Sequence, residues 1–363
     1  MLDGRDPALV ALAGADARES NALRAGLRVG EAIDDDVALV AATSGTTGVP
    51  KGAMLTAAAL TASAMATHDR LGGPGSWLLA LPPHHIAGVQ VLVRSVLAGS
   101  APVEMDVSAG FKVDQLPAAI RGLGQGRRYT SLVAAQLAKA LGDPAATAAL
   151  AELDAVLLGG GPAPRPVLND AAAAGITVVR TYGMSETAGG CVYDGLPLHG
   201  VRLRTVDGRI VIGGATLAKG YRNPVDPDPF AEPGWFATDD LGALSDAGVL
   251  TVLGRADDAI STGGLTVLPQ PVEAALCSHP SVSDCAVFGV ADDRLGQRVV
   301  AAIVVRDGSA APTLDALRAQ VTRTLDAIAA PRELHVVDAL PRRGIGKVDR
   351  TALVRRFAGT SDQ

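Results

Sequence analysis

The sequence predicts an α/β protein in which a large N-terminal domain is followed by a small α+β domain. At 363 residues the chain exceeds the size at which one hydrophobic core usually stops growing, so we expect two domains. In the first half, short apolar runs alternate with Ala- and Leu-rich stretches, which is typical of a mostly parallel sheet covered by helices. A new cycle of helices and strands begins after Gly254-Arg255, which indicates the second domain.

The elements of the large domain follow from its apolar pattern. The apolar runs predict strands at Val37–Ala42, Trp77–Leu81, Ala155–Leu158 and Ile176–Val179. The Ala- and Leu-rich stretches predict helices at Thr56–His68, Val113–Leu123 and Pro164–Ala174. Short strands separated by Gly, Asp and Pro turns then predict an antiparallel subdomain, with strands at Val201–Val206, Arg209–Ile212 and Val249–Leu253.

The small domain is expected to contain a second set of elements. They are a helix near Val272–Ser278, strands at Ala286–Val290 and Val299–Val305, a helix near Thr313–Ile328 and a strand at Glu333–Val337. We place the boundary between residues 256 and 257, so the large domain is expected to span 1–256 and the small domain 257–363.

Composition excludes several classes of protein. The net charge of -6 leaves no general basic field, so a nucleic-acid-binding surface or a polybasic membrane patch would have to be strictly local. No apolar run reaches the roughly 20 residues that span a bilayer, so we expect no stable membrane insertion. The cysteines, Cys191, Cys277 and Cys285, lack the spacing of a zinc site, and the N-terminus lacks the pattern of a secretory leader. We therefore expect a cytoplasmic protein.

The strongest chemical signal is the Gly- and Thr-rich loop of residues 43–52, between an expected strand and an expected helix. Its glycines let the backbone approach an anion, its hydroxyls offer hydrogen bonds and Lys51 adds a charge, which together suit nucleotide phosphates. It is not a Walker A loop, because Lys51 stands between Pro50 and Gly52. The alternative is a flexible turn. The candidate phosphate ligands are Thr43, Ser44, Gly45, Thr46, Thr47, Gly48 and Lys51.

This loop resembles that of the adenylate-forming superfamily, which includes acyl-CoA synthetases, luciferases and peptide-synthetase adenylation domains. The resemblance implies that ATP and Mg²⁺ are bound and that further motifs follow in a fixed order, and they do. In Pro82-Pro83-His84-His85-Ile86-Ala87-Gly88 the family's histidine falls on His85, which implies that His85 gates the carboxylate near the α-phosphate. Taken alone, two histidines at a strand-to-helix turn are more often surface or capping residues.

Two further motifs resemble the family's adenine and phosphate sites. Gly159, Gly160 and Gly161 correspond to the loop on which the adenine ring lies, although a Gly-rich loop with Pro is a common end for any strand. In the run of residues 182–187, the resemblance implies that Tyr182 stacks on adenine, Ser185 hydrogen-bonds the α-phosphate and Glu186 holds Mg²⁺. Gly183 lies in the same motif. Many relatives have Thr where Ser185 stands, and the hydroxyl is retained.

Downstream residues resemble the family's ribose site and hinge. The resemblance implies that Asp240 accepts both ribose hydroxyls, that Arg255 is a second ribose contact and that Asp257 is the position where the small domain pivots. Asp239 replaces a usual glycine. It would be either an exposed turn residue or a weakly repulsive charge beside the nucleotide.

Near the end of the chain, residues 341–350 resemble the motif whose lysine enters the first half-reaction. The resemblance implies that Lys347 bridges the attacking carboxylate and the α-phosphate, where a cation offsets developing charge. A basic surface loop is the alternative. Gly264 lies where relatives approach the thiol arm of coenzyme A, the co-substrate of the second half-reaction.

The resemblance implies an ATP-dependent acid–CoA ligase acting on a small carboxylic acid. The phosphate loop starts nearer the N-terminus than in most relatives, so we expect a reduced sheet or a lost subdomain, and a homodimer that covers the exposed apolar face is one consequence. Such compactness occurs among o-succinylbenzoate–CoA ligases of menaquinone synthesis, and the chain looks most like the actinobacterial form. A cation should then hold the second carboxylate, unless the candidates are all surface charges: Arg94, Lys112, Arg127 and Arg128.

Three alternatives remain open at this point. A general fatty or aryl acyl-CoA synthetase would share the motifs, and so would an adenylation enzyme that loads a carrier protein. A noncatalytic nucleotide-binding relative is the third alternative, although Lys51, Glu186, Asp240 and Lys347 are all present.

Overall fold

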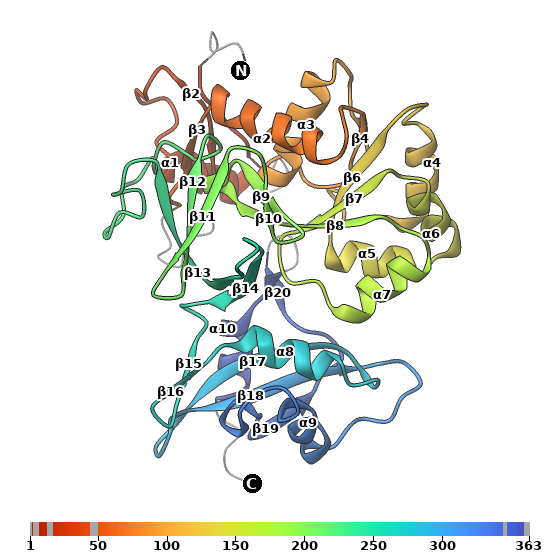
Figure 1. Ribbon diagram of the computed structural model, residues 1–363, viewed down its shortest axis with the longest axis vertical. Coiled ribbons are helices and arrows are strands. Elements are labelled where there is room, and N and C mark those ends of the chain that lie inside the picture. The colour runs from red at the N-terminus through yellow and green to blue at the C-terminus, as the bar shows by residue number, and fades with distance from the viewer. Residues whose placement is uncertain (1, 3–6, 13–16, 44–49, 344–346, 359–363) are drawn as a thin grey trace.

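The computed structural model describes residues 2, 7–12, 17–43, 50–343 and 347–358. A large N-terminal part and a small C-terminal part lie one above the other in Figure 1, and the last strand of the large part lies at the side that faces the small part. The predicted α/β fold class with a large and a small domain is confirmed. The position of the boundary stays a prediction.

The large part is built around a seven-stranded sheet. Its strands are β4 (Ser76–Leu79), β5 (Val103–Glu104), β6 (Arg128–Val133), β7 (Ala155–Gly159), β8 (Val178–Met184), β9 (Gly189–Tyr193) and β10 (Leu196–Pro197). Their order is β10-β9-β8-β7-β6-β4-β5. The strands from β8 to β5 run parallel, whereas β9 and β10 add antiparallel at one edge. The predicted mostly parallel sheet is therefore present.

Helices cover both faces of this sheet. One face carries α4 (Leu116–Arg121), α5 (Ala134–Leu141), α6 (Pro144–Ala151) and α7 (Arg165–Ala173), and the other carries α2 (Ala57–Arg70) and α3 (Ile86–Leu97). Along β7, Val156 and Leu158 pack into the first core, while Ala155 and Leu157 pack into the second. Because both faces are buried, the strand reads as a continuous apolar run, which is why it could be predicted from sequence.

The phosphate-loop segment joins two strands of a separate three-stranded sheet. This sheet contains β1 (Leu9–Val10), β2 (Val37–Ala41) and β3 (Ala53–Thr56), and the helix α1 (Ala17–Gly26) lies between β1 and β2. The predicted strand at residues 37–42 is present as β2. Strand β3 was not predicted, and it ends where Thr56 caps α2 by accepting a hydrogen bond from Ala59 N at 3.0 Å.

The antiparallel subdomain is a four-stranded sheet with the order β11-β12-β13-β14. Its strands are β11 (Val201–Val206), β12 (Arg209–Gly214), β13 (Trp235–Leu244) and β14 (Leu250–Arg255). Strand β13 brings the predicted ribose motif next to β14, which leads into the small part.

The small part has a five-stranded sheet with helices on both faces. Its elements are β15 (Ile260–Thr262), β16 (Leu265–Val267), α8 (Pro269–Cys277), β17 (Val282–Asp292), β18 (Gly296–Val305), α9 (Leu314–Val321), β19 (Glu333–Val336), β20 (Arg342–Arg343), β21 (Lys347–Val348) and α10 (Arg350–Phe357). The predicted helix at 313–328 is too long, because α9 ends at Val321 and a separate 3-10 turn follows at Ala327–Ala329. The β15–β16 hairpin was not predicted.

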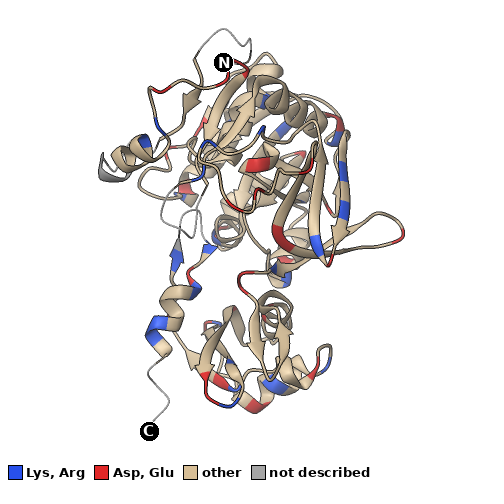
Figure 2. Ribbon diagram, turned by 90° about the vertical axis from the view of Figure 1, so that its left-hand side faces the viewer, with Lys and Arg blue, Asp and Glu red and all other residues tan. Residues whose placement is uncertain are grey.

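The surface carries charges of both signs. Lys and Arg are interspersed with Asp and Glu over both parts of the molecule (Figure 2). None of the helices in the described ranges is both long and apolar enough to cross a bilayer.

Candidate active site

Most of the predicted site residues meet where the parallel strands end. His84 and His85 follow β4, Gly159 is the last residue of β7, and Tyr182 lies near the end of β8. In open α/β sheets, ligands bind at the carboxyl ends of the strands. Figure 1 shows β14 and β20 between the two parts of the molecule.

The predicted adenine loop follows β7 closely packed against β8. A Cβ on Gly159 would lie 2.4 Å from Thr181 Oγ1, so a side chain at this position would clash with the neighbouring strand. Gly160 has a φ of +81°, which favours glycine. A Cβ on Gly161 would meet nothing within 4 Å, so the space beside this part of the loop is open and no side chain covers the backbone. Such a surface can accept an aromatic base.

Tyr182 and Asp240 form one unit although they lie on different sheets. The hydroxyl of Tyr182 donates to Asp240 Oδ2 at 2.7 Å. Burial, and then the Asp240 charge, raise the pKa of Tyr182, so its hydroxyl stays protonated and acts as the donor. Burial also raises the pKa of Asp240, against the effects of Tyr182 and Arg255. The pair leaves Asp240 Oδ1 facing Arg255 Nη1 at 3.7 Å.

Arg255 lies at the centre of an ion network beside Asp240. It donates to both oxygens of Asp257 at 2.7 Å, and its Nη2 lies 3.6 Å from Asp239 Oδ2. Asp239 also accepts from Arg209 Nη1 at 3.0 Å, and its side chain is 54% exposed. Asp239 is therefore an exposed, paired residue, and two arginines offset its charge.

Ser185 and Glu186 lie in a 3-10 turn, η2 (Ser185–Thr187), directly after β8. Thr187 fixes this turn, because its hydroxyl accepts from Met184 N at 3.0 Å and donates to Gly189 O at 2.7 Å. A Cβ on Gly183 would lie 2.1 Å from Gly189 O, so only glycine allows the chain to fold back this closely. The turn holds Glu186 in a buried position, with 8% of the residue exposed.

The surroundings of Glu186 fit a magnesium ligand. Its Oε1 accepts from the hydroxyl of Tyr221 at 2.7 Å, and in the described ranges no Lys, Arg or His pairs with it. Burying a carboxylate is costly, and one hydrogen bond offsets this cost only in part, so a bound cation would stabilise Glu186 here. No group of three or more His, Cys, Asp or Glu gathers among the described residues. That suits Mg²⁺, which typically takes one or two carboxylates together with phosphates and water.

The phosphate loop is described only at its two ends. Ser44, Gly45, Thr46, Thr47 and Gly48 lie outside the described residues. Thr43 lies two residues after the end of the buried strand β2. At the other end, Lys51 Nζ lies 5.3 Å from the ring centroid of Tyr221, which belongs to the same cluster as Glu186.

His85 is half-buried, and its ring centroid lies 4.4 Å from that of His84. It occupies the N-cap position of α3, but its side chain makes no capping hydrogen bond there. Burial, the neighbouring His84 and the charge of Lys347 together lower the pKa of His85 to about 4. The imidazole is therefore uncharged at neutral pH. An uncharged ring can lie beside a carboxylate and a phosphate without taking up a proton.

This pKa gives a testable pH dependence. The pKa of His85 is about 4 in the folded protein, below the ordinary value of 6.5. The contribution of neutral His85 to the free energy of unfolding is therefore complete above pH 6.5, and it is lost as the pH falls through about 4. We expect its ring signal in a proton NMR titration, assigned with His85→Gln, to have a midpoint near 4. Lys347→Ala should raise that midpoint. A midpoint near 6.5 in both proteins would contradict the placement of His85.

Lys347 reaches the large part from the small part. It lies in β21, paired with β20, and its charge adds to the lowering of the His85 pKa and acts against the burial that raises the pKa of Asp240. Arg350, at the start of α10, donates to Asp258 Oδ2 at 3.0 Å and to Glu273 Oε1 at 2.6 Å, which ties this segment to the residue after the predicted hinge and to α8. By contrast, Gly264 lies in the β15–β16 hairpin, which Figure 1 shows far from β14 and β20. The structure thus brings Lys347 to the site and not Gly264.

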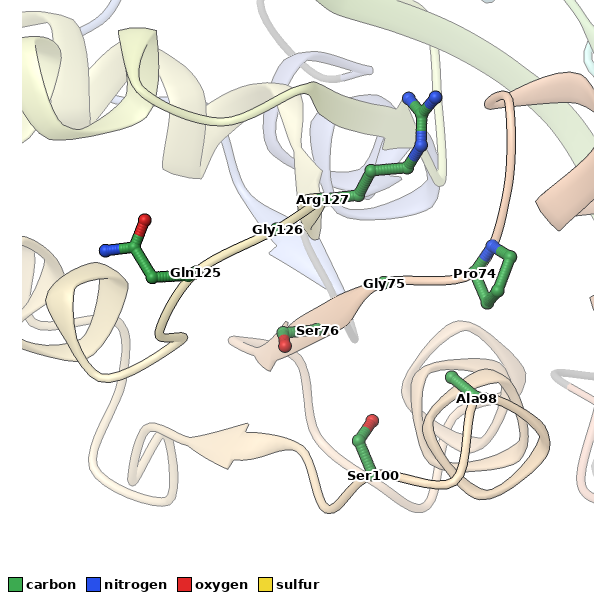
Figure 3. A pocket seen from close by; sticks show the side chains of 8 residues that line it. All are labelled: Pro74, Gly75, Ser76, Ala98, Ser100, Gln125, Gly126 and Arg127. Atoms are coloured by element: carbon green, nitrogen blue, oxygen red, sulfur yellow. The ribbon is translucent and has the colours of Figure 1, made fainter.

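A separate pocket lies at the opposite edge of the main sheet (Figure 3). Ser76, at the start of β4, and Arg127, just before β6, line it. Because these positions precede the parallel strands, the pocket lies away from the carboxyl ends that carry the site.

The sequence analysis missed Tyr221 and Arg209 as residues of the site. Both lie between motifs, so no local pattern in the sequence indicates them.

Comparison with known proteins agrees with this geometry. Residues 8–222 match the model of the AMP-binding enzyme family, and residues 271–347 match that of the AMP-binding enzyme C-terminal domain. The chain is similar to a probable 2-succinylbenzoate–CoA ligase of Mycobacterium tuberculosis (strain ATCC 25618 / H37Rv), with 79% identity over 100% of this chain and 94% of the relative.

Two solved structures of one Bacillus subtilis enzyme are also similar. The first is o-succinylbenzoate CoA synthetase in complex with the acyl-adenylate intermediate OSB-AMP, with a TM-score of 0.75, 30% identity and coverage of 89% of this chain and 72% of that chain. The second is the same enzyme with ATP and magnesium ion, with a TM-score of 0.74, 30% identity and coverage of 89% and 73%. From its motifs, its fold and these matches, the chain belongs to the AMP-binding enzyme family.

Proposed function

We propose that this protein is an ATP-dependent 2-succinylbenzoate–CoA ligase of menaquinone biosynthesis. The enzyme activates the acid as an acyl-adenylate and then transfers the acyl group to coenzyme A. The observation that carries the mechanism is the placement of Lys347, from the small part, where its charge acts on His85 and Asp240 of the large part. The name of the 79% identical relative supports the choice of acid.

In the first half-reaction, a carboxylate oxygen of the acid bonds to the α-phosphorus of ATP, and the bond from that phosphorus to pyrophosphate breaks. Lys347 offsets the charge that develops between the carboxylate and the α-phosphate, and the hydroxyl of Ser185 hydrogen-bonds the same phosphate. Glu186 would hold Mg²⁺, which would supply positive charge to the phosphate oxygens. Neutral His85 borders the path of the carboxylate. Because its ring is uncharged, it forms no ion pair that would keep the carboxylate away from the α-phosphate.

The nucleotide would lie across the carboxyl edge of the main sheet. The adenine ring would rest between Tyr182 and the loop of residues 159–161, and Gly183 allows the close turn that follows Tyr182. Asp240 accepts the ribose hydroxyls, with Arg255 beside it. The phosphates then extend toward Ser185 and the loop from Thr43 to Lys51.

In the second half-reaction, the thiol sulfur of coenzyme A bonds to the acyl carbon, the acyl–AMP bond breaks and the thiol proton passes to solvent. The small domain, which we assign to residues 257–363, would pivot at Asp257 so that the hairpin of Gly264 replaces Lys347 at the site. The double hydrogen bond from Arg255 to Asp257 spans this boundary and favours the orientation seen here. We also assign the protein to the cytoplasm, without nucleic-acid or membrane partners, and a homodimer remains part of the proposal.

Arg94 is the cation that we assign to the second carboxylate of the acid. Of the four candidates, Lys112 and Arg127 are exposed, and Arg128 pairs with Glu152 at 3.3 Å. Arg94 is 2% exposed and has no carboxylate partner among the described residues.

The surroundings of Arg94 lead back to the site. Its guanidinium lies 4.9 Å from the ring of Trp77 and donates to the hydroxyl of Tyr193 at 3.3 Å. Ile86, Gln90 and Arg94 share one face of α3, and both Ile86 and Gln90 border Gly189, which follows the Glu186 turn. Eight residues separate Ile86 from Arg94, which is about 12 Å along the helix axis. Because helical side chains lean toward the N-terminus, the guanidinium lies closer to Ile86 than this, and a dicarboxylate can reach from the site to Arg94.

The test of the function is pyrophosphate release from MgATP with 2-succinylbenzoate, with and without coenzyme A, followed by mass detection of the thioester. Pyrophosphate release without coenzyme A and thioester formation with it are the expected results. Turnover only with aryl or fatty acids would replace the menaquinone assignment with a general acyl-CoA synthetase. Transfer to a phosphopantetheinyl carrier in preference to coenzyme A would indicate a carrier-loading enzyme, and no turnover with any acid would contradict the proposal.

A further inference from the structure

The segment of residues 219–223 is bound along the exit of the phosphate loop. Ala53 of β3 and Tyr221 form a bridge in antiparallel orientation. Backbone hydrogen bonds extend this pairing on both sides: Lys219 N to Met54 O at 2.8 Å, Met54 N to Gly220 O at 2.9 Å, Arg222 N to Gly52 O at 2.7 Å and Asn223 N to Lys51 O at 3.0 Å. The backbone of Tyr221 is therefore fixed relative to Lys51.

Side chains strengthen this attachment. Asn223 Nδ2 donates to Pro50 O at 2.7 Å and to Gly26 O at 2.6 Å. Arg222, only 8% exposed, donates to Ala32 O at 2.7 Å and to other carbonyls of the same N-terminal segment. The segment thus ties the phosphate loop to the N-terminal elements.

The ring of Tyr221 is held by aromatic packing beneath Lys51. Phe230 packs edge-on at 5.4 Å, and Phe230 in turn packs against Phe236 of β13 at 4.7 Å. Lys51 Nζ lies 5.3 Å from the Tyr221 ring centroid, within the range of a cation–π interaction. The ring therefore borders Lys51 on one side.

The hydroxyl of Tyr221 contacts Glu186, the proposed magnesium ligand. It donates to Glu186 Oε1 at 2.7 Å. A tyrosine hydroxyl carries its proton at neutral pH, so Tyr221 is the donor and the Glu186 carboxylate the acceptor. The neighbouring backbone also holds the Glu186 residue, because Ala218 N donates to Glu186 O at 2.8 Å. One segment thus fixes Glu186 through both its main chain and its side chain.

We propose that Tyr221 is a positioning residue that couples the phosphate loop to the magnesium carboxylate. Its hydroxyl fixes Oε1 of Glu186 and so presents Oε2 toward the nucleotide, while its ring sets the position of Lys51. This inference rests on the proposed function, since it takes Glu186 as the residue that holds Mg²⁺.

The experiment measures ATP binding by calorimetry in Mg²⁺ and in EDTA, for wild type and Tyr221→Phe. Phenylalanine keeps the ring, its packing on Phe230 and its contact with Lys51, and removes only the hydrogen bond to Glu186. A hydrogen bond to a charged group is typically worth enough to change affinity about tenfold, so we expect the gain in ATP affinity from Mg²⁺ to fall by about five- to tenfold. Affinity in EDTA should not change.

Two comparisons separate positioning from a general effect on the fold. Tyr129→Phe removes a buried hydroxyl that donates to Leu71 O at 3.2 Å and Gly73 O at 3.1 Å, away from the site, and should leave the Mg²⁺ gain unchanged. In a Glu186→Gln background, Tyr221→Phe should have no further effect on the Mg²⁺ gain, because the two residues act through one carboxylate.

The outcomes are distinct. Equal weakening of ATP binding in Mg²⁺ and in EDTA, or additive effects of Tyr221→Phe and Glu186→Gln, would overturn the positioning role. A wild-type protein that binds MgATP but adenylates no acid would contradict the proposed function and leave the binding comparison for Tyr221 valid.

Discussion

Replacing Lys347 with alanine should slow acyl-adenylate formation by about 100- to 1,000-fold, the usual cost of removing one group that stabilises transition-state charge. Thioester formation from supplied 2-succinylbenzoyl-adenylate should stay near the wild-type rate, because in the proposed mechanism the small domain pivots and carries Lys347 away from this position for the second half-reaction. The physical reason is the position of Lys347, whose charge acts on His85 and Asp240 across the boundary between the two parts. Pyrophosphate release and thioester mass measure the two half-reactions separately.

Arg355→Ala is the matched control for Lys347→Ala. Arg355 is an exposed cation on α10 of the same small part, and its removal should change neither half-reaction strongly. If Lys347→Ala slowed both half-reactions equally, the lysine would be supporting the fold of the small part, and its assigned role in adenylation would be wrong.

The residues that could be predicted from sequence are those whose signal is local. The run around Tyr182 and Glu186 and the glycines at 159–161 are short motifs in which a few positions determine a turn and its chemistry. Strands such as β7 were predicted because both faces are buried, so every position is apolar.

The remaining features depend on contacts between segments that are distant in the chain. The hydroxyl of Tyr221 reaches Glu186, and Arg209 pairs with Asp239, yet neither pairing leaves a pattern in sequence. Asp239 illustrates the difference well. Sequence alone left it as an exposed turn residue or a repulsive charge, and only the tertiary structure places Arg209 and Arg255 beside it.

The sequence also could not decide which of the candidate cations for the second carboxylate are buried. Arg94 stands in an apolar stretch of α3 and is buried there, whereas Arg128 follows a Gly-rich turn, lies at the start of β6 and pairs with Glu152. The free-energy cost of burying a cation that pairs with no described carboxylate is the reason why we propose Arg94 for the second carboxylate of the acid.

Arg94→Met should therefore separate stability from substrate binding. Methionine fills a similar volume without a charge, and replacing buried charges with apolar residues is often neutral or stabilising by about 1–4 kcal/mol, so the melting temperature should not fall. The KM for 2-succinylbenzoate should rise by about 100-fold, because losing one partner of a buried charge pair typically costs about 2–5 kcal/mol. The KM for ATP should not change.

A substrate analogue makes this prediction specific to the second carboxylate. With 4-oxo-4-phenylbutanoate, which lacks the carboxylate on the ring, Arg94→Met should react as well as wild type or better, because no charge then faces the apolar methionine. Arg127→Met removes an exposed arginine at the pocket of Figure 3 and should alter neither KM. Equal loss with both acids, or a lower melting temperature with an unchanged KM, would mean that Arg94 supports the packing of α3 on Trp77 and that another residue holds the carboxylate.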